Sequence, residues 1–172
     1  MTVRNLEFLF RPASVAVVAE PDEPSRYAEV VLANLAAGGF NGPVLRVGAR
    51  KRLLFPMSHD VRIGELDVVP DLAIICASLD RVPSIIAQLG ACGTRAAIVG
   101  PWMWRNMSGK EIEKARQGIL EAARPHLIRI LGPGSGGFVV PARGLNASAT
   151  PVAVMPGKIA LVAQSTAVAA AV

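Results

Sequence analysis

The chain has 172 residues, of which 52% are hydrophobic and 18% charged, and its net charge is +5. This composition can fill the core of one sizeable domain and excludes an intrinsically disordered chain. Only 5% of the residues are aromatic, which disfavours a ligand held by stacking, as in many single-stranded nucleic-acid binders. The positive charge favours an anionic partner, but the basic residues form no stripe along a predicted helix, so we expect no nucleic-acid partner.

The predicted compartment is the cytoplasm. Arg4, Glu7 and Arg11 interrupt the apolar stretch that a signal peptide needs, and no uninterrupted apolar run is long enough to cross a bilayer. Cys76 and Cys92 have no metal-ligand spacing and no secretory context, so they are interpreted as buried or incidental thiols. We therefore expect a cytoplasmic protein without a membrane partner.

The first predicted unit is a strand followed by a helix. Residues 14–19 form a continuous β-prone run that stops before Pro21. Pro24 suits the first turn of the helix, and the pair Gly38 and Gly39 supplies a left-handed stop. The apolar face of this helix, at spacings of three and four residues, consists of Ala28, Val31, Leu32 and Leu35.

Further strands and helices follow in alternation, whereas residues 53–70 give no clear prediction. The strands are predicted over residues 44–47, 72–76, 96–99 and 127–131. Asp80 can cap a helix that Gly93 ends, and Ser108 with Glu111 forms a capping-box pattern. The inward faces of these two helices are Val82, Ile85, Ile86 and Leu89 in the first, and Ile112, Ala115 and Ile119 in the second. Strands separated by helices pair in parallel, which predicts an α/β fold with an open, doubly wound sheet.

The composition of the sequence changes after Leu131. A glycine-rich turn over residues 132–137 leads into a stretch that is predicted to be mostly irregular up to residue 157. A new strand over residues 159–162 and a helix capped by Ser165 follow, and the helix reaches Val172 without a capping residue. We therefore expect a first domain over residues 1–133, a linker over 134–157 and the truncated start of a second domain over 158–172.

The candidate ligand site is the ring of loops at the carboxyl ends of the strands, where open parallel sheets bind their ligands. These loops cover residues 19–25, 47–52, 76–80 and 99–105. The first loop lacks the glycines that let a backbone approach a pyrophosphate, and an inward-pointing Glu20 would repel a phosphate. A standard site for NAD or FAD is therefore excluded.

The remaining polar residues predict a binding module rather than a catalyst. The run Arg50, Lys51 and Arg52 either holds phosphates or is a solvated charged surface. His59 and His126 have no predicted nucleophile or metal partner and are interpreted as surface or packing residues, with His126 at the amino end of the fifth strand. Two tryptophans, at 102 and 104, line the crevice or cover the sheet edge, and the loop serine at 135 is either a donor or part of a turn. No paired carboxylates, nucleophile with its base, or metal-binding group can be assembled.

Several stretches resemble the N-terminal part of ADP-forming acyl-CoA synthetases, relatives of the α subunit of succinyl-CoA synthetase. They are LFRPASVAVV (9–18), NLAAGGFNGPV (34–44), PDLAI (70–74), LGP (131–133), GLNAS (144–148) and PGKIALVAQS (156–165). The NGPV and GLNAS stretches are especially similar to bacterial Pat-type protein lysine acetyltransferases, which carry a degenerate synthetase module. The resemblance implies a Rossmann-like domain for coenzyme A (CoA) or acyl-CoA, followed by the start of a flavodoxin-like domain.

Carried over by position, the resemblance implies that CoA lies across the loops at the carboxyl edge. The Ala19, Glu20 and Pro21 triplet stands where the family has Gly-Ala-Ser, and Arg50 keeps the cation of the loop after the second strand. The complete set of implied cofactor-binding positions is Ala19, Glu20, Pro21, Ser25, Val47, Arg50, Lys51, Ala77, Ser78, Val99 and Ser135.

Three functions are compatible with this resemblance. The first is a CoA-binding regulatory module of a protein acetyltransferase, and the second is the CoA-binding part of an active ADP-forming acetate or acyl-CoA ligase. The third is a structural domain that has lost its ligand. The implied partners are the remaining synthetase-like domains of the parent protein, and the oligomeric state stays open. An acidic residue usual after the fourth strand is missing from residues 100–104, and the family's phosphorylated histidine lies in a domain outside this chain, so the chain alone is expected not to be catalytic.

Overall fold

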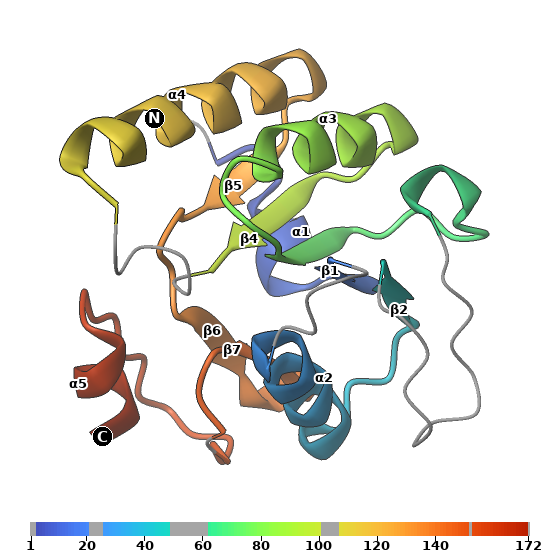
Figure 1. The fold of residues 1–172 in the computed structure, drawn as a ribbon. Coiled ribbons are helices and arrows are strands. Elements are labelled where there is room, and N and C mark those ends of the chain that lie inside the picture. The colour runs from blue at the N-terminus through green and yellow to red at the C-terminus, as the bar shows by residue number, and fades with distance from the viewer. Residues whose placement is uncertain (1–2, 21–25, 49–61, 101–106, 152, 172) are drawn as a thin grey trace.

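A five-stranded parallel sheet with the order β2-β1-β3-β4-β5 forms the centre of the molecule. The computed structural model describes residues 3–20, 26–48, 62–100, 107–151 and 153–171 (Figure 1). The predicted α/β class and open, doubly wound sheet are confirmed. The strands are β1 (Val15–Ala19), β2 (Val44–Val47), β3 (Leu72–Cys76), β4 (Ala96–Val99) and β5 (Arg129–Leu131).

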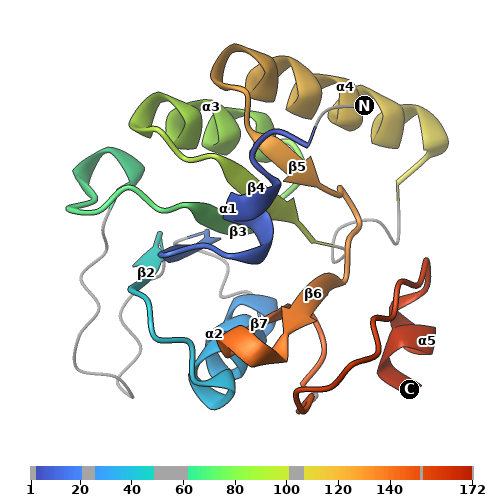
Figure 2. The ribbon, with the colours of Figure 1, turned by 180° about the vertical axis from the view of Figure 1, so that it is seen from behind.

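Helices cover both faces of the sheet. Figure 1 shows α3 and α4 on one side and α2 on the other, and the view from behind in Figure 2 agrees. The helices of this part of the chain are α1 (Leu6–Phe10), α2 (Arg26–Gly38), α3 (Val82–Cys92) and α4 (Gly109–Ala123), with short 3-10 helices at Ile63–Glu65 and Arg124–His126.

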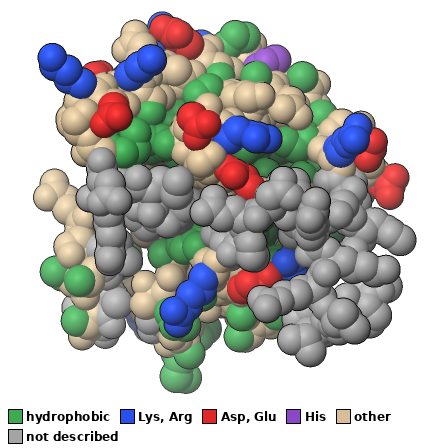
Figure 3. Space-filling model, viewed as in Figure 1, with side chains coloured by type: hydrophobic (Ala, Val, Ile, Leu, Met, Phe, Trp, Pro, Cys, Tyr) green, Lys and Arg blue, Asp and Glu red, His purple; other side chains and the backbone are tan. Residues whose placement is uncertain are grey.

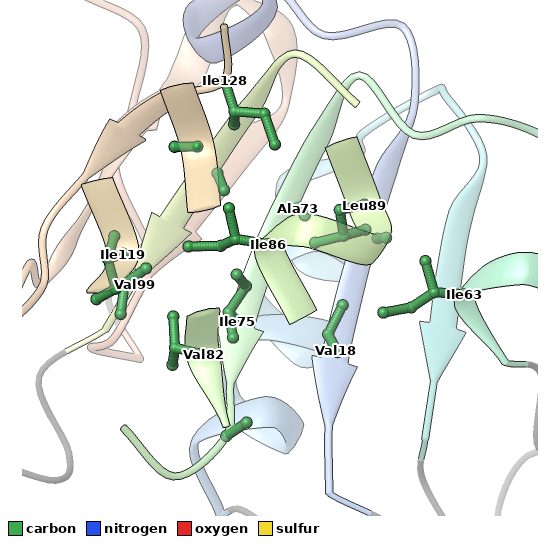
Figure 4. Packing of buried hydrophobic residues seen from close by; sticks show 14 of the residues in the cluster. Val18, Ile63, Ala73, Ile75, Val82, Ile86, Leu89, Val99, Ile119 and Ile128 are labelled. Atoms are coloured by element: carbon green, nitrogen blue, oxygen red, sulfur yellow. The ribbon is translucent and has the colours of Figure 1, made fainter. Parts of the chain in front are cut away.

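Alternating side chains of the strands build two hydrophobic cores. In β1, Ala16 and Val18 face α3 and α4, whereas Val15 and Val17 face α2, and all four are buried. Figure 4 shows the first core, in which Ile86 of α3 lies over the sheet among side chains from the strands and α4. A strand buried on both faces needs apolar residues at every position, which explains its unbroken hydrophobic sequence.

Most helix boundaries follow the predicted local signals. The capping box of α4 is present, since Glu111 N donates to Ser108 Oγ (3.4 Å) and Ser108 N donates to Glu111 Oε2 (2.7 Å). Gly93 ends α3 with φ +104°. The predicted cap by Asp80 is wrong, because α3 begins one residue later than that cap requires and its N-cap residue, Arg81, makes no side-chain capping hydrogen bond. Pro24 lies outside the described residues.

The fifth strand is shorter than predicted. Leu127 has a left-handed backbone, with φ +57°, and ends the 3-10 helix before it, so pairing with β4 starts only at Arg129. A residue with positive φ cannot continue an extended strand, and this conformation therefore sets the start of β5.

The prediction of a mostly irregular stretch after the sheet is wrong. It contains an antiparallel hairpin of β6 (Gly137–Val140) and β7 (Leu145–Ser148), which packs on α2 and contributes Leu145 and Ala147 to the second core. Asn34 of α2 donates from Nδ2 to the carbonyl oxygens of Ser148 (3.1 Å) and Thr150 (2.9 Å). These residues are therefore part of the packed structure rather than an unstructured connection.

The predicted strand over residues 159–162 does not form. None of the described strands pairs with these residues, and Ile159 and Val162 are 95% and 97% exposed. An isolated extended segment cannot satisfy its backbone donors and acceptors in a ladder, which accounts for the missing strand. The predicted helix is present as α5 (Thr166–Ala171), with Ser165 Oγ accepting from Val168 N at 3.5 Å. Figures 1 and 2 show this helix beside the hairpin, away from the sheet.

Candidate ligand-binding site

The order of the strands reverses between β1 and β3. These two strands are neighbours in the sheet, although β2 separates them in the sequence. The chain passes from β1 to β2 on one side and later returns to place β3 on the other side. Ala19 and Cys76 are paired at the carboxyl ends of β1 and β3. The loops after such a pair lead to opposite faces of the sheet, and open α/β sheets in general bind their ligands beside the carboxyl ends of the strands at this point.

Two of the predicted site residues meet at this point. Glu20 follows β1 and Ser78 follows β3, 58 positions later in the chain. Glu20 Oε1 accepts a hydrogen bond from Ser78 N (2.5 Å) and another from Ser78 Oγ. Both donors of Ser78 therefore converge on one oxygen of an anionic group at the switch point of the sheet.

The position of Ser78 is also fixed from the other side. Its carbonyl oxygen accepts from Arg81 N at 3.0 Å, which closes the turn that leads into α3. This turn comes from local backbone geometry and does not involve Glu20. The turn holds the Ser78 backbone N–H in place, and the rotatable Ser78 hydroxyl can turn to the same anionic oxygen, whether of the protein or of a ligand.

Four other predicted positions contribute backbone rather than side chains to the edge. Ala19, Val47, Ala77 and Val99 are all less than 8% exposed. Val47 and Val99 belong to the core shared with α3 and α4, where their side chains contact other apolar residues. A ligand at the carboxyl edge would meet the main chain at these positions, because the side chains are packed inside.

The glycine-rich turn reaches the same edge. Ser135 N donates to the carbonyl of Val99, and Gly134 N donates to that of Gly100, both at 3.3 Å. Gly132 has φ +110°, and a Cβ atom there would collide with the Val99 carbonyl oxygen, so this close approach requires glycine. Ser135 is thereby placed next to the end of β4, and its Oγ accepts from Gly137 N at 3.1 Å.

Several predicted residues lie outside the described part of the chain. They are Pro21, Ser25, Arg50, Lys51, Arg52, His59, Trp102 and Trp104. Their proposed roles rest on the sequence alone.

The described residues that carry reactive groups are not arranged for catalysis. Burial raises the pKa of the Cys76 thiol far above its usual range, so the thiol stays protonated and cannot act as a nucleophile. His126 packs against Gly90 of α3, at the amino edge as predicted and away from the switch point. Within the described ranges, no cluster of His, Cys, Asp and Glu could hold a metal ion.

On the face that Figure 3 shows, the charges of the described residues are of both signs. Figure 3 shows basic and acidic side chains interspersed over α3 and α4. In the described part of the chain, no helix has the length and apolar character that a bilayer span requires.

A hollow of about 710 Å³ at the opposite edge was not predicted. It lies where the chain enters β1 and β2, and residues 11–13, 38–42 and 142–145 line it. The sequence indicates a helix stop at Gly38 and Gly39, and this local pattern does not predict a surface hollow. The hollow is separated from the switch point by the length of the sheet.

The fold and this edge define a class: open α/β domains that bind a nucleotide-like ligand at a topological switch point. The family model described as "CoA binding domain" matches residues 13–141. This chain belongs to that family of CoA-binding domains.

Curated relatives and solved structures agree with this assignment. The chain is 30% identical to the α subunit of acetate–CoA ligase (ADP-forming) I of Pyrococcus furiosus over 167 residues, covering 94% of this chain and 36% of that protein. It is 27% identical to acetate–CoA ligase (ADP-forming) II of Archaeoglobus fulgidus, covering 95% and 24%. A solved structure of the Ca. Korarchaeum cryptofilum dinucleotide-forming acetyl-coenzyme A synthetase 1, in complex with phosphate and ADP, aligns with a TM-score of 0.81 and 28% identity, covering 96% and 35%. The chain thus spans about a quarter to a third of the length of these relatives.

Proposed function

We propose that this chain binds CoA or acyl-CoA at the carboxyl edge of its sheet. The observation that carries the proposal is the pair of Ser78 donors, which hold an anionic oxygen at the switch point of a domain from the CoA-binding family. The Glu20 carboxylate there occupies the kind of position that a phosphate oxygen would take. The donors are thus suited to the negatively charged part of CoA.

The remaining contacts of this proposal come from the sequence. Arg50 and Lys51 follow β2 and supply positive charge for phosphates of the nucleotide portion. Ser25, Pro21 and Ser135 complete the edge at the loops after β1 and β5. The cytoplasm, where CoA-dependent enzymes find their cofactor, is the compartment that we expect for the protein.

The parent protein is proposed to be synthetase-like. The relatives named as acetate–CoA ligases favour the CoA-binding part of an ADP-forming ligase. The regulatory module of an acetyltransferase rests on the NGPV and GLNAS stretches alone. The coding sequence after Val172 distinguishes the two, because an ATP-grasp region with a histidine loop indicates the ligase and an acetyltransferase domain indicates the regulator.

Residues 158–172 are proposed to begin a second α/β domain. The support is the combination of an exposed apolar segment, Ile159 to Val162, with a helix that starts after Ser165. Such a segment can become a central strand only when neighbouring strands provide hydrogen-bond partners on both sides.

Calorimetric titration with CoA tests the proposed function, with acetyl-CoA as a second ligand and NAD as the comparison. We expect heat of binding for CoA and for acetyl-CoA, and none for NAD. Thermal unfolding in parallel should show stabilisation, which amounts to about 2.7 kcal/mol when the free ligand is 100 times its dissociation constant. Absence of both heat and stabilisation at millimolar CoA would leave the non-binding structural domain as the function.

A further inference from the structure

We propose that Glu20 determines the strength of CoA binding, because it is an internal anion that competes with a phosphate group of the ligand for the Ser78 donors. This inference rests on the proposed function and concerns the same site. It predicts that the site binds phosphate-bearing ligands more tightly once the Glu20 carboxylate is removed.

The competition follows from the number of donors at the switch point. Ser78 provides one N–H and one O–H, and both are directed to Glu20 Oε1. Each donor hydrogen can make one strong hydrogen bond, so an incoming phosphate oxygen finds both already used. Two anionic oxygens beside the same donors would also repel each other, because the half-buried setting of Glu20 and Ser78 screens their charges less than bulk water does.

The contact between Glu20 and Ser78 comes from the fold, because the two residues are far apart in the sequence. Glu20 and Ser78 come from the loops after two adjacent strands, and the pairing of Ala19 with Cys76 brings these loops together. Ser78 keeps its turn through the Arg81 N–H, which does not involve the carboxylate. Removal of the Glu20 side chain therefore leaves the Ser78 N–H oriented and both donors free, and the hydroxyl can rotate toward an incoming phosphate oxygen.

Three variants separate charge, size and donor number. Glu20→Ala frees both donors, Glu20→Gln keeps the size and an oxygen acceptor but removes the charge, and Glu20→Ala combined with Ser78→Ala removes the hydroxyl donor. Glu121→Ala is the matched control, since it makes the same change in net charge at an exposed position near the end of α4. Circular dichroism and thermal unfolding establish that each variant is folded before binding is measured.

The readout is the dissociation constant for CoA and for inorganic pyrophosphate, measured by calorimetry at physiological ionic strength. We expect Glu20→Ala to bind CoA about tenfold or more tightly than the unaltered chain, the factor that corresponds to one charge-assisted hydrogen bond. Glu20→Gln should show a smaller gain, and the double variant should lose part of the gain of Glu20→Ala. Glu121→Ala should match the unaltered chain within about twofold, because exposed charges away from the site are screened.

The outcomes separate this inference from the proposed function. Tighter CoA binding by Glu20→Ala, with weaker but measurable binding by the unaltered chain, supports both. CoA binding by Glu20→Ala but not by the unaltered chain supports the competition and contradicts the proposed function of the unaltered chain. CoA binding of equal or lower affinity in a folded Glu20→Ala overturns the competition while the proposed function stands. An equal gain in Glu121→Ala also overturns it, since net charge alone then explains the change. No binding by any variant contradicts the proposed function, and the inference with it.

Discussion

Charged residues of opposite sign follow the first two strands of the sheet in the sequence. Glu20 after β1 brings a negative charge to the switch point, where its carboxylate accepts two hydrogen bonds from Ser78. Arg50 and Lys51 supply positive charge in the sequence after β2, the strand next to β1. In the proposed site, the charges predict that a ligand with phosphates is attracted by the second loop and opposed by Glu20, and we expect the balance between these residues to set its affinity.

We expect Arg50→Ala to weaken CoA binding by about 1.5 to 3 kcal/mol, since a hydrogen bond to a charged group contributes that amount. The basis is the position of Arg50 in the sequence, where the resembled synthetases keep a lysine. Calorimetric titration measures the change, and Lys114→Ala on the exposed side of α4 is the control for charge. An unchanged dissociation constant at low salt would identify Arg50 as a solvated surface residue.

The elements after the sheet are held by α2. The end of α2 approaches the turn between β6 and β7 so closely that a Cβ atom on Gly38 would lie 2.5 Å from the Gly144 carbonyl oxygen. Next to it, Asn34 is nearly buried and donates to carbonyl groups of Ser148 and Thr150. A close backbone contact and a buried polar anchor together explain how a hairpin without a place in the main sheet is still ordered.

Replacement of Asn34 by Ala is expected to lower the free energy of unfolding by about 1 to 3 kcal/mol, because the buried Ser148 carbonyl loses its Asn34 donor and the Thr150 carbonyl keeps only the Ser148 hydroxyl. Urea denaturation monitored by circular dichroism measures the effect. Gln117→Ala removes an amide from an exposed position of α4 and should change stability little. Equal unfolding midpoints for the two variants would show that the hairpin is anchored without Asn34.

The start of α4 predicts a dependence on pH. Hydrogen bonds from the Ser108 side chain and backbone hold the pKa of Glu111 below its ordinary value. A lowered pKa in the folded state means that the stabilisation is present above the unfolded pKa and is lost as the pH falls through the folded pKa. Glu111→Gln should therefore be less stable than the unaltered chain at neutral pH, and this difference should shrink in acid.

Urea denaturation over a series of pH values tests the capping box. Glu121→Gln, on the same helix but outside the capping box, accounts for the loss of a charge as such. If the difference between Glu111→Gln and the unaltered chain stays constant from neutral to strongly acidic pH, the ionised Glu111 carboxylate does not stabilise the helix end.

At the scale of the whole molecule, the chain has a fold for binding but no catalytic arrangement in its described residues. Transfer of phosphate through a histidine needs a nucleophile held in line with stabilising donors. His126 lies at the edge opposite the switch point, and the buried Cys76 thiol is protonated. His59 lies outside the described residues.

We therefore expect no acyl-CoA synthetase activity and no autophosphorylation when the chain is incubated by itself with labelled ATP, acetate, CoA and magnesium. Label is followed by gel and mass spectrometry, and acetyl-CoA by chromatography against a reaction without protein. Label on His59 or His126, or acetyl-CoA above that control, would contradict the expectation. A full-length ADP-forming acetate–CoA ligase serves as the positive control.

The sequence by itself determined the five strands of the parallel sheet, the helices α2 to α5 and the α/β class, because these depend on local signals. Buried runs such as residues 72–76, and the Ser108 capping box, carry their information within a few neighbouring positions. Only the tertiary structure decided the partner of Glu20, since Ser78 is 58 positions away and becomes a neighbour only through the pairing of β1 with β3. Contacts beyond the local sequence also decided two other features. The hairpin of β6 and β7 forms because it packs on α2. Residues 159–162 form no strand because none of the described strands pairs with them.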